Sequence, residues 1–283
     1  MTRGASVVMA GLAGAMLASS QGPGYFAQYF DRVVTGIPFS GQSVTEVVQP
    51  LADGNHLRQE STATVARDSR GRMRYGSMLT GLTISKTFTV IRDPVAGVRY
   101  VLDADQKTVQ RSSIPPAASE SRTVTKERPD SKPPDLAMIA ARESLSPLLD
   151  LMAREGAARQ GAASAKSPAS AKSEQPEVVS LGHQVIEGVA VTGARASAVL
   201  PAGQIGNEKP VSISLEVWCS KDLSIVVLSK LIAPRTGVTT FQLKHLQRVE
   251  PAPELFEVPA GYHVLGAAPA RREPNSPQRG PKR

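Results

Sequence analysis

The chain has 283 residues, a formal net charge of +8 and a single cysteine. This length allows one large domain or two small ones, and a lone cysteine excludes an internal disulfide. The segment 266–283 holds five positive charges and one negative, a net of +4, and Arg3 adds one more. The remaining chain therefore carries only about +3, which excludes an extended surface for nucleic acid.

The first twenty residues predict a secretory signal peptide. Arg3 precedes an uncharged apolar run, and the small residues Ala18 and Ser20 stand at the −3 and −1 positions of a cleavage site before Gln21. The run is short and glycine-rich for a membrane span, and an uncleaved N-terminal anchor helix is the alternative. We therefore expect an exported protein that is periplasmic or extracellular.

The next segment, 24–39, predicts a short amphipathic leading helix. Its apolar side chains recur at helical spacing, and the helix is expected to end at Gly36 and Pro38. From Leu57 to Leu102 the apolar residues alternate with polar ones, which is typical of strands with one buried face. The strands are separated by turns at 53–55, 68–71, 93–97 and 103–105.

A helical insertion is predicted at 135–155. Asp135 can cap a first helix, and Ser146 followed by Pro147 can begin a second, so a pair of helices is expected. Segments rich in Pro, Ser, Ala and charge on both sides predict flexible linkers: 113–134 and 156–177.

After the second linker, apolar and polar residues alternate again, which is typical of strands. The odd positions of 211–217 are apolar and are expected to point inward, and 223–232 is apolar on both faces, which predicts a central covered strand. The following strand is predicted to place Phe241, Leu243 and Val249 on one face. The tail 266–283, rich in Pro and Arg, predicts a disordered basic segment that can contact anionic envelope surfaces.

Four stretches resemble a family of uncharacterised exported bacterial proteins: PFSGQSVTEVVQPLADGNHLRQESTATVARDSRGRMR, IRDPVAGVRYVLDADQKTVQR, LGHQVIEGVAVTGARASAVLPAGQIGN and SLEVWCSKDLSIVVLSK. The resemblance covers most of the chain outside the linkers and the tail, and it brings no established activity. The family usually has an aromatic residue, a proline and an aspartate where this chain has Cys219, Lys221 and Ala233. Any role of those positions in the relatives is therefore in doubt here.

More distantly, the order of elements is similar to the LolA-like and RseB-like lipoprotein-localisation fold. The resemblance implies one α+β domain over 21–265, built on a curved antiparallel sheet that forms an unclosed half-barrel. About 10–11 strands are expected, with a leading helix and a helical lid or plug on the concave side.

No motif of a catalytic or metal site is present. The loop PAGQIGN at 201–207 has the glycines of a phosphate cradle, but a strand follows it instead of a helix, so a strand connector is expected. Cys219 has no histidine near it in sequence, and the four histidines lie in different strands. We therefore expect no enzyme, no cofactor and no metal.

The favoured function is an exported binding protein of the cell envelope that holds an acyl chain or other apolar ligand on the concave face. The alternative is an envelope sensor or protein–protein interaction module, and an exported hydrolase is least expected. Trp218 is either the floor or rim of the cavity or a residue packed under the leading helix. The residues expected to line the cavity are Trp218, Phe88, Val90, Phe241, Leu148 and Met152.

Overall fold

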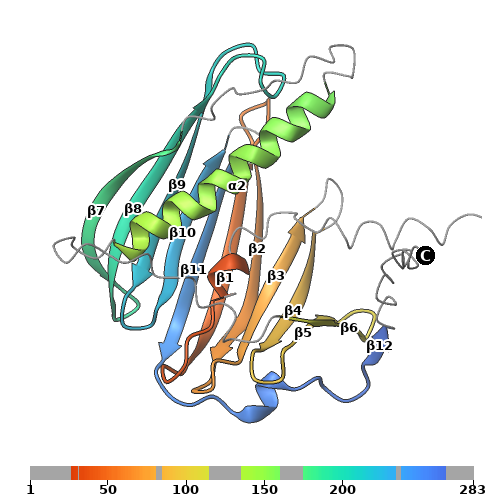
Figure 1. Ribbon diagram of the computed structural model, residues 1–283. Coiled ribbons are helices and arrows are strands. Elements are labelled where there is room, and N and C mark those ends of the chain that lie inside the picture. The colour runs from red at the N-terminus through yellow and green to blue at the C-terminus, as the bar shows by residue number, and fades with distance from the viewer. Residues whose placement is uncertain are drawn as a thin grey trace, which may run out of the picture.

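In the part of the chain that the structure describes, one α-helix packs on a single large curved sheet (Figure 1), as seen in a computed structural model. None of the described helices is long and apolar enough to cross a membrane. The predicted signal peptide, most of both linkers and the basic tail lie outside the described residues. The structure describes residues 27–30, 32–80, 85–114, 135–159, 175–233 and 237–265.

Twelve strands form the sheet, which is one or two more than the sequence predicted. The additional pairing comes from a short last strand beyond the predicted meander. The strands are β1 (Phe39–Pro50), β2 (His56–Arg67), β3 (Met73–Thr80), β4 (Ser85–Asp93), β5 (Val98–Asp103), β6 (Thr108–Ser113), β7 (Glu177–Ile186), β8 (Val189–Leu200), β9 (Val211–Ser220), β10 (Ile225–Ala233), β11 (Gly237–Gln247) and β12 (His263–Leu265).

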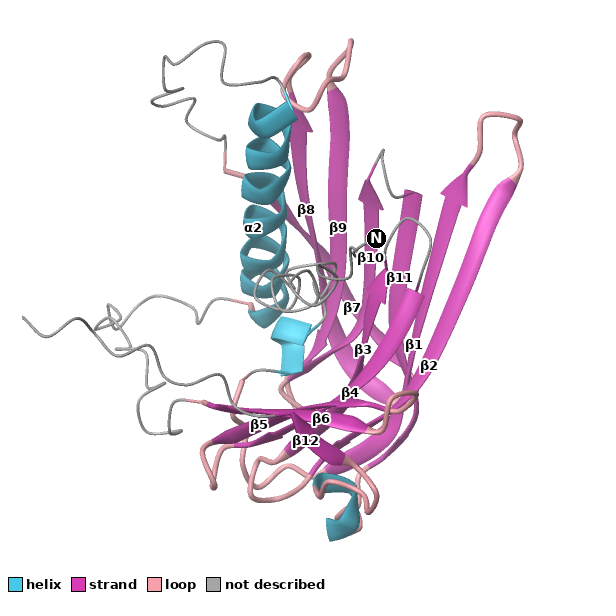
Figure 2. Cartoon of the chain, turned by 90° about the vertical axis from the view of Figure 1, so that its right-hand side faces the viewer, coloured by secondary structure: helices cyan, strands magenta, loops and turns pink. Residues whose placement is uncertain are grey.

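The sheet is open, because its two outer strands do not pair with each other. The order is β12-β6-β5-β4-β3-β2-β1-β11-β10-β9-β8-β7, and all neighbours are antiparallel except β12 and β6. Two meanders, β1–β6 and β7–β11, meet at the β1–β11 pair, where Val44 lies opposite Gln242. Figure 2 shows how strongly the strands curve, with the long helix α2 (Leu136–Arg159) on the inner side. The predicted curved, unclosed antiparallel sheet is confirmed.

The helical insertion is one helix and not the predicted pair. Helix α2 runs from Leu136 to Arg159 and contains Pro147. The prediction of a break at Ser146 was wrong because the apolar face continues across it, with Leu145 and Leu148 both buried against the sheet. The Ser146 hydroxyl donates to the Arg142 carbonyl oxygen at 3.0 Å instead of capping a new helix.

The leading helix is much shorter than predicted. Only a 3-10 turn, η1 (Ala27–Phe30), forms among the described residues of this segment, and the chain is extended from Phe39 onward. Phe30 in η1 stacks on Tyr75 of β3 at 4.7 Å between ring centroids and meets Phe241 of β11 edge-on at 5.8 Å. Aromatic packing from a single turn thus covers the middle of the sheet, and a longer helix is not needed for it.

The buried guanidinium of Arg67 ties distant segments together at one end of the sheet. It donates to the carbonyl oxygens of Ile37 and Leu223, and it lies over the Phe39 ring at 4.9 Å from the centroid. Burial lowers the pKa of Arg67 to about 10. Because both carbonyls belong to turns far apart in the chain, this side chain connects β2 with the β9–β10 turn.

The alternation of β9 is confirmed, but that of β11 breaks near its end. Ile213, Leu215 and Val217 are buried on one face of β9, as predicted. In β11, His245 has a φ of 56°, which reverses the side-chain direction beyond Leu243. Val249 is therefore 56% exposed and does not join Phe241 and Leu243 in the core.

Replacing Pro147 by alanine should raise the free energy of unfolding by about 1–2 kcal/mol. Alanine restores an N–H for the Glu143 carbonyl, and the gain is smaller than the full cost of an interior proline because the unfolded chain also becomes freer. Urea unfolding followed by circular dichroism measures the change. Pro201→Ala, in the loop after β8, is the control and should stay within about 0.5 kcal/mol; a less stable Pro147→Ala variant would contradict the expectation.

Candidate functional site

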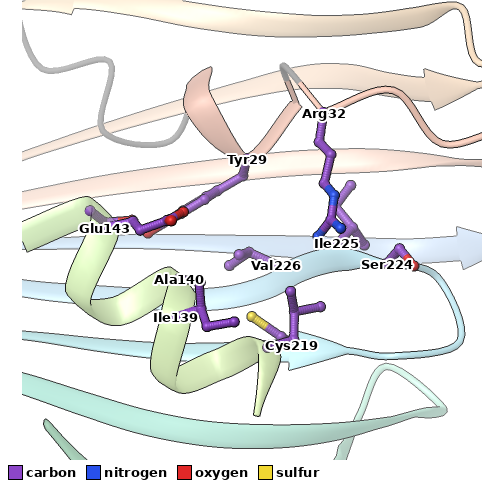
Figure 3. Close-up of a pocket in the computed structure, with 11 residues that line it drawn as sticks. Tyr29, Arg32, Ile139, Ala140, Glu143, Cys219, Ser224, Ile225 and Val226 are labelled. Carbon is purple, nitrogen blue, oxygen red and sulfur yellow. The ribbon is translucent and has the colours of Figure 1, made fainter. Parts of the chain in front are cut away.

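A pocket lies between α2, η1 and the turn region of β9 and β10 (Figure 3). Its volume is about 160 Å³. The aliphatic side chains of its wall come from α2 and β10, and two charged side chains are also part of it. The lining residues are Tyr29, Arg32, Leu136, Ile139, Ala140, Glu143, Ser144, Cys219, Ser224, Ile225 and Val226.

Helix α2 presents two apolar faces, and the pocket uses the less covered one. Ala137, Ala141 and Leu145 are fully buried against β8 and β9. A second apolar stripe lies next to this buried face on the helix surface and is only half-buried. It consists of Leu136, Ile139 and Ala140, whose spacing of three and four residues places them on the same side of the helix. The helix therefore has apolar surface that neither the sheet nor η1 covers completely.

The N-terminus of α2 is held on the sheet by one carboxylate. Oδ1 of Asp135 accepts a hydrogen bond from the Ala137 N–H at 3.0 Å, and the same atom accepts one from the Thr192 hydroxyl of β8 at 2.9 Å. The first bond confirms the predicted N-cap. The second fixes the end of the helix relative to β8, and thus sets the width of the pocket.

Hydroxyl groups line the deep side of the pocket. Burial raises the pKa of Tyr29 to about 12, and hydrogen bonding with the hydroxyls of Ser144 and Ser229 lowers it only in part. Ser144 and Ser229 are themselves buried. The tyrosine therefore stays a neutral phenol at physiological pH, and this wall carries hydroxyl dipoles but no charge.

The charges of the pocket lie at its rim. Arg32 follows η1 and Glu143 belongs to α2, and both are exposed. Figure 3 shows them apart from each other, with the Arg32 side chain extending toward Ile225 of β10. The pocket thus has one cationic and one anionic side chain in its lining.

Cys219 is a buried, unreactive thiol in the pocket wall. It is 1% exposed, so it is not accessible for a disulfide with another chain. Burial, and to a smaller extent the charge of Asp135, raises the pKa of this thiol to about 12. The nucleophilic thiolate is therefore negligible near neutral pH. The PAGQIGN loop, which lies between β8 and β9, is a strand connector, as predicted, with positive φ at Gly203 and Gly206.

The free energy of unfolding should fall as the pH rises from about 9 to about 12. The folded thiol of Cys219 keeps its proton up to about pH 12, whereas the thiol of the unfolded chain loses it near its ordinary value of 9.0. The unfolded state therefore releases a proton first and gains stability, by about 1.4 kcal/mol per pH unit for one group. Urea unfolding at a series of pH values measures this slope.

The variant Cys219→Ala isolates the contribution of the thiol. Its stability should decline less steeply than that of the native chain from about pH 9 upward. Above about pH 10 the loss due to Tyr29 remains, and it is opposed by Arg67, whose pKa in the folded chain is about 10 and lies below its ordinary value of 12.5. Identical slopes in the two proteins would contradict the raised pKa of the thiol.

Trp218 lies on the face of β9 that points away from α2. Its neighbours Val217 and Cys219 pack with α2, and successive side chains of a strand point to opposite faces. The indole lies over Gly193 of β8, where an added Cβ would come within 2.5 Å of the ring. The indole N–H donates to Oε1 of Glu216 at 2.8 Å.

The carboxylate of Glu216 links this tryptophan to a surface ion pair. Arg195 donates to Oε2 of Glu216 at 3.0 Å. Partial burial raises the pKa of Glu216, but the hydrogen bonds from Trp218 and Arg195 and the charges of Arg195 and Lys230 together outweigh it, so the pKa is lowered. Trp218 is therefore a well-packed residue of the outer face.

None of the six side chains that the sequence singled out lines this pocket. Leu148 and Met152 pack between α2 and the sheet, and Val90, Phe241 and Trp218 belong to the second core cluster. Phe88 is half-buried on β4. That these residues line a ligand cavity stays a prediction. The pocket residues were missed because they come from segments far apart in the chain, although the helical spacing of Leu136, Ile139 and Ala140 predicts that these three share one stripe.

Gly193→Ala should destabilise the protein by about 1–3 kcal/mol, because the new methyl group overlaps the Trp218 ring. The cost should shrink in a Trp218→Leu background, which removes the overlapping ring atoms, and thermal unfolding of the four proteins measures this coupling. Ser197→Ala, on the same face of β8, is the control. Equal costs of Gly193→Ala in both backgrounds would contradict the contact.

The described residues hold no cluster of three or more His, Cys, Asp or Glu side chains that could bind a metal ion. The pocket therefore offers apolar surface, hydroxyl groups and two rim charges. These groups can hold a molecule, but they do not include a nucleophile with a base beside it.

No family model matches the chain, and no curated protein matches it. Among solved structures, the chain is similar to one in the MucA/MucB complex of Pseudomonas aeruginosa, with a TM-score of 0.35 and 14% identity over 87% of this chain. It spans 62% of the length of that protein. The lipoprotein LppX of Mycobacterium tuberculosis has a TM-score of 0.29 and 13% identity, with 84% of this chain and 98% of LppX covered.

A LolA superfamily protein of Nitrosomonas europaea has a TM-score of 0.29 and 7% identity, with 83% of this chain and 96% of that chain covered. The LolA-like resemblance stated from the sequence is thus found again among solved structures, as a remote likeness. Because the TM-scores are 0.35 and below, a function has to be argued from the pocket itself.

Proposed function

We propose that this chain is a non-enzymatic binding protein of the cell envelope, which holds an apolar chain in the pocket between α2, η1 and β10. The observation that carries the proposal is the half-buried apolar stripe of Leu136, Ile139 and Ala140, which faces Ile225 and Val226 across the pocket. A ligand that covers this apolar surface gains about 0.8 kcal/mol of binding free energy for each methylene group that it buries.

The pocket volume sets the size of the group that it accepts. Ligand pockets for drug-sized molecules are commonly about 300–1,000 Å³, whereas an apolar cavity of about 150 Å³ holds one benzene molecule. At about 160 Å³, this pocket accommodates a segment of about six carbons. It therefore takes one end of an acyl chain, and a whole lipid would require α2 to move away from β10.

Helix α2 is the element that can act as a lid. Apart from its apolar contacts with the sheet, its N-terminus is fixed to β8 by the Asp135–Thr192 hydrogen bond. Movement of the helix would widen the pocket while the strands beneath it stay paired. This role supports the helical lid that was expected from the sequence.

The chemistry of the pocket supports binding without catalysis. Its thiol and its phenol are both held in the neutral form by burial, with each pKa raised to about 12. The exposed rim charges lie apart from each other (Figure 3). An interaction with another envelope protein through the same pocket would use one apolar side chain of that protein in place of the acyl chain.

Titration with straight-chain alcohols from butanol to octanol tests the proposal. The methyl NMR signals of Ile139 and Ile225 should shift, and the affinity should rise about fourfold per methylene until about six carbons are buried, after which it should level off. Neutral alcohols probe the apolar wall alone, without any contribution from a charged headgroup.

Two variants with the same added side chain serve as test and control. Ala140→Phe fills the pocket and should reduce the octanol affinity by at least about tenfold, which is the loss expected when two or more methylenes cannot be buried. Arg142→Phe places the same ring on an exposed position of α2 outside the pocket and should leave the affinity unchanged. Absence of any octanol binding by the native protein would refute the proposed function.

A further inference from the structure

We infer that the ligand of this pocket is a single-chain amphiphile with an anionic headgroup, which the guanidinium of Arg32 binds at the pocket opening. This inference rests on the proposed function, since it adds the headgroup to an apolar chain already seated in the pocket. The shared chemistry is a carboxylate or phosphate on a straight alkyl chain.

The first observation is the position of Arg32. It lines the pocket although it comes from outside the helix and the sheet, in the segment that follows η1. In Figure 3 its side chain runs down toward β10, where Ser224 and Ile225 lie. Its alkyl stem can thus cover apolar surface while the guanidinium stays at the boundary with water.

The second observation concerns its partners. Among the described residues, the ion pairs found elsewhere in the fold do not include Arg32. Glu143, the other charged residue of the pocket, lies apart from Arg32 in Figure 3, and it has interactions of its own. Within that part of the chain, the charge of Arg32 is therefore directed at the pocket without being neutralised by a carboxylate.

The third point is the chemistry of a guanidinium at such a place. Its planar set of N–H donors matches the two oxygens of a carboxylate or phosphate, and such charge-assisted hydrogen bonds are stronger than neutral ones. The deep wall offers only neutral hydroxyl groups, from Tyr29 and Ser144. An amphiphile therefore binds with its chain inward and its anionic group at Arg32, and the reverse orientation would bury the charge.

Four probes with the same eight-carbon chain separate the headgroup from the chain: octanoate, octyl phosphate, octanol and octylammonium. Their dissociation constants are measured by the methyl NMR shifts of Ile139 and Ile225 at low ionic strength. Octanoate or octyl phosphate should bind about tenfold more tightly than octanol. This gain is at the lower end of the range for a hydrogen bond to a charged group, because Arg32 is exposed to water. Raising the salt concentration should reduce this difference.

Variants of the arginine identify the group responsible. Arg32→Gln should bring the anionic probes to the affinity that octanol has in the same variant, and Arg32→Lys should keep part of the difference because it keeps the charge. Arg142→Gln removes an exposed arginine of α2 that is not part of the pocket, and it should change nothing. Unfolding curves of each variant confirm that the fold is intact.

The outcomes are distinct for the two proposals. If octanol binds but octanoate and octyl phosphate bind no more tightly, or if Arg32→Gln keeps their advantage, the headgroup inference is wrong and the apolar pocket stands. Tighter binding of octylammonium would also overturn it and would point to Glu143. If octanol does not bind at all, the proposed function fails and the inference fails with it. The stronger of the two anions assigns the headgroup as carboxylate or phosphate.

Discussion

The structure depends on one constraint: an open sheet with an apolar inner face must be covered by few helical residues. Helix α2 covers the β8 and β9 side, and η1 covers the middle through Phe30 and its contacts with Tyr75 and Phe241. The Asp135 carboxylate sets where α2 sits, because one of its oxygens both caps the helix and accepts the hydroxyl of Thr192. Apolar burial drives the docking, and this polar contact gives it a fixed position.

The pocket lies beside the place where the two covers meet, at the contact of Tyr29 of η1 with Ser144 of α2. Its walls come from the inner ends of both, Tyr29 on one side and Ile139 on the other, and its floor comes from β9 and β10. The deep wall is apolar or hydroxylated, and the charges stay at the opening, which separates a place for a chain from a place for a headgroup.

Local patterns predicted the elements of this fold much better than its site. The alternating pattern of β9 correctly predicted its buried face, because Ile213, Leu215 and Val217 all pack against one continuous helix. The break at Ser146-Pro147 could not be rejected from local signals, because buried contacts on both sides of the proline outweigh its cost within the helix. The exposure of Val249 likewise depends on the positive φ of His245, and no turn residue in the sequence marks it. The pocket is lined by segments that are far apart in the sequence, and the order of the strands in the sheet brings them together. Local patterns therefore could not predict it.

The β1–β11 pair at the centre of the sheet has a consequence for the order in which the chain folds. It joins residues about two hundred positions apart, such as Val44 and Gln242, whereas the other antiparallel pairs join neighbouring strands of a meander. Closing so long a loop costs entropy before any contact offsets it. The two meanders therefore form early as separate units, and their union at β1 and β11 is the slow, late step that creates the common inner face.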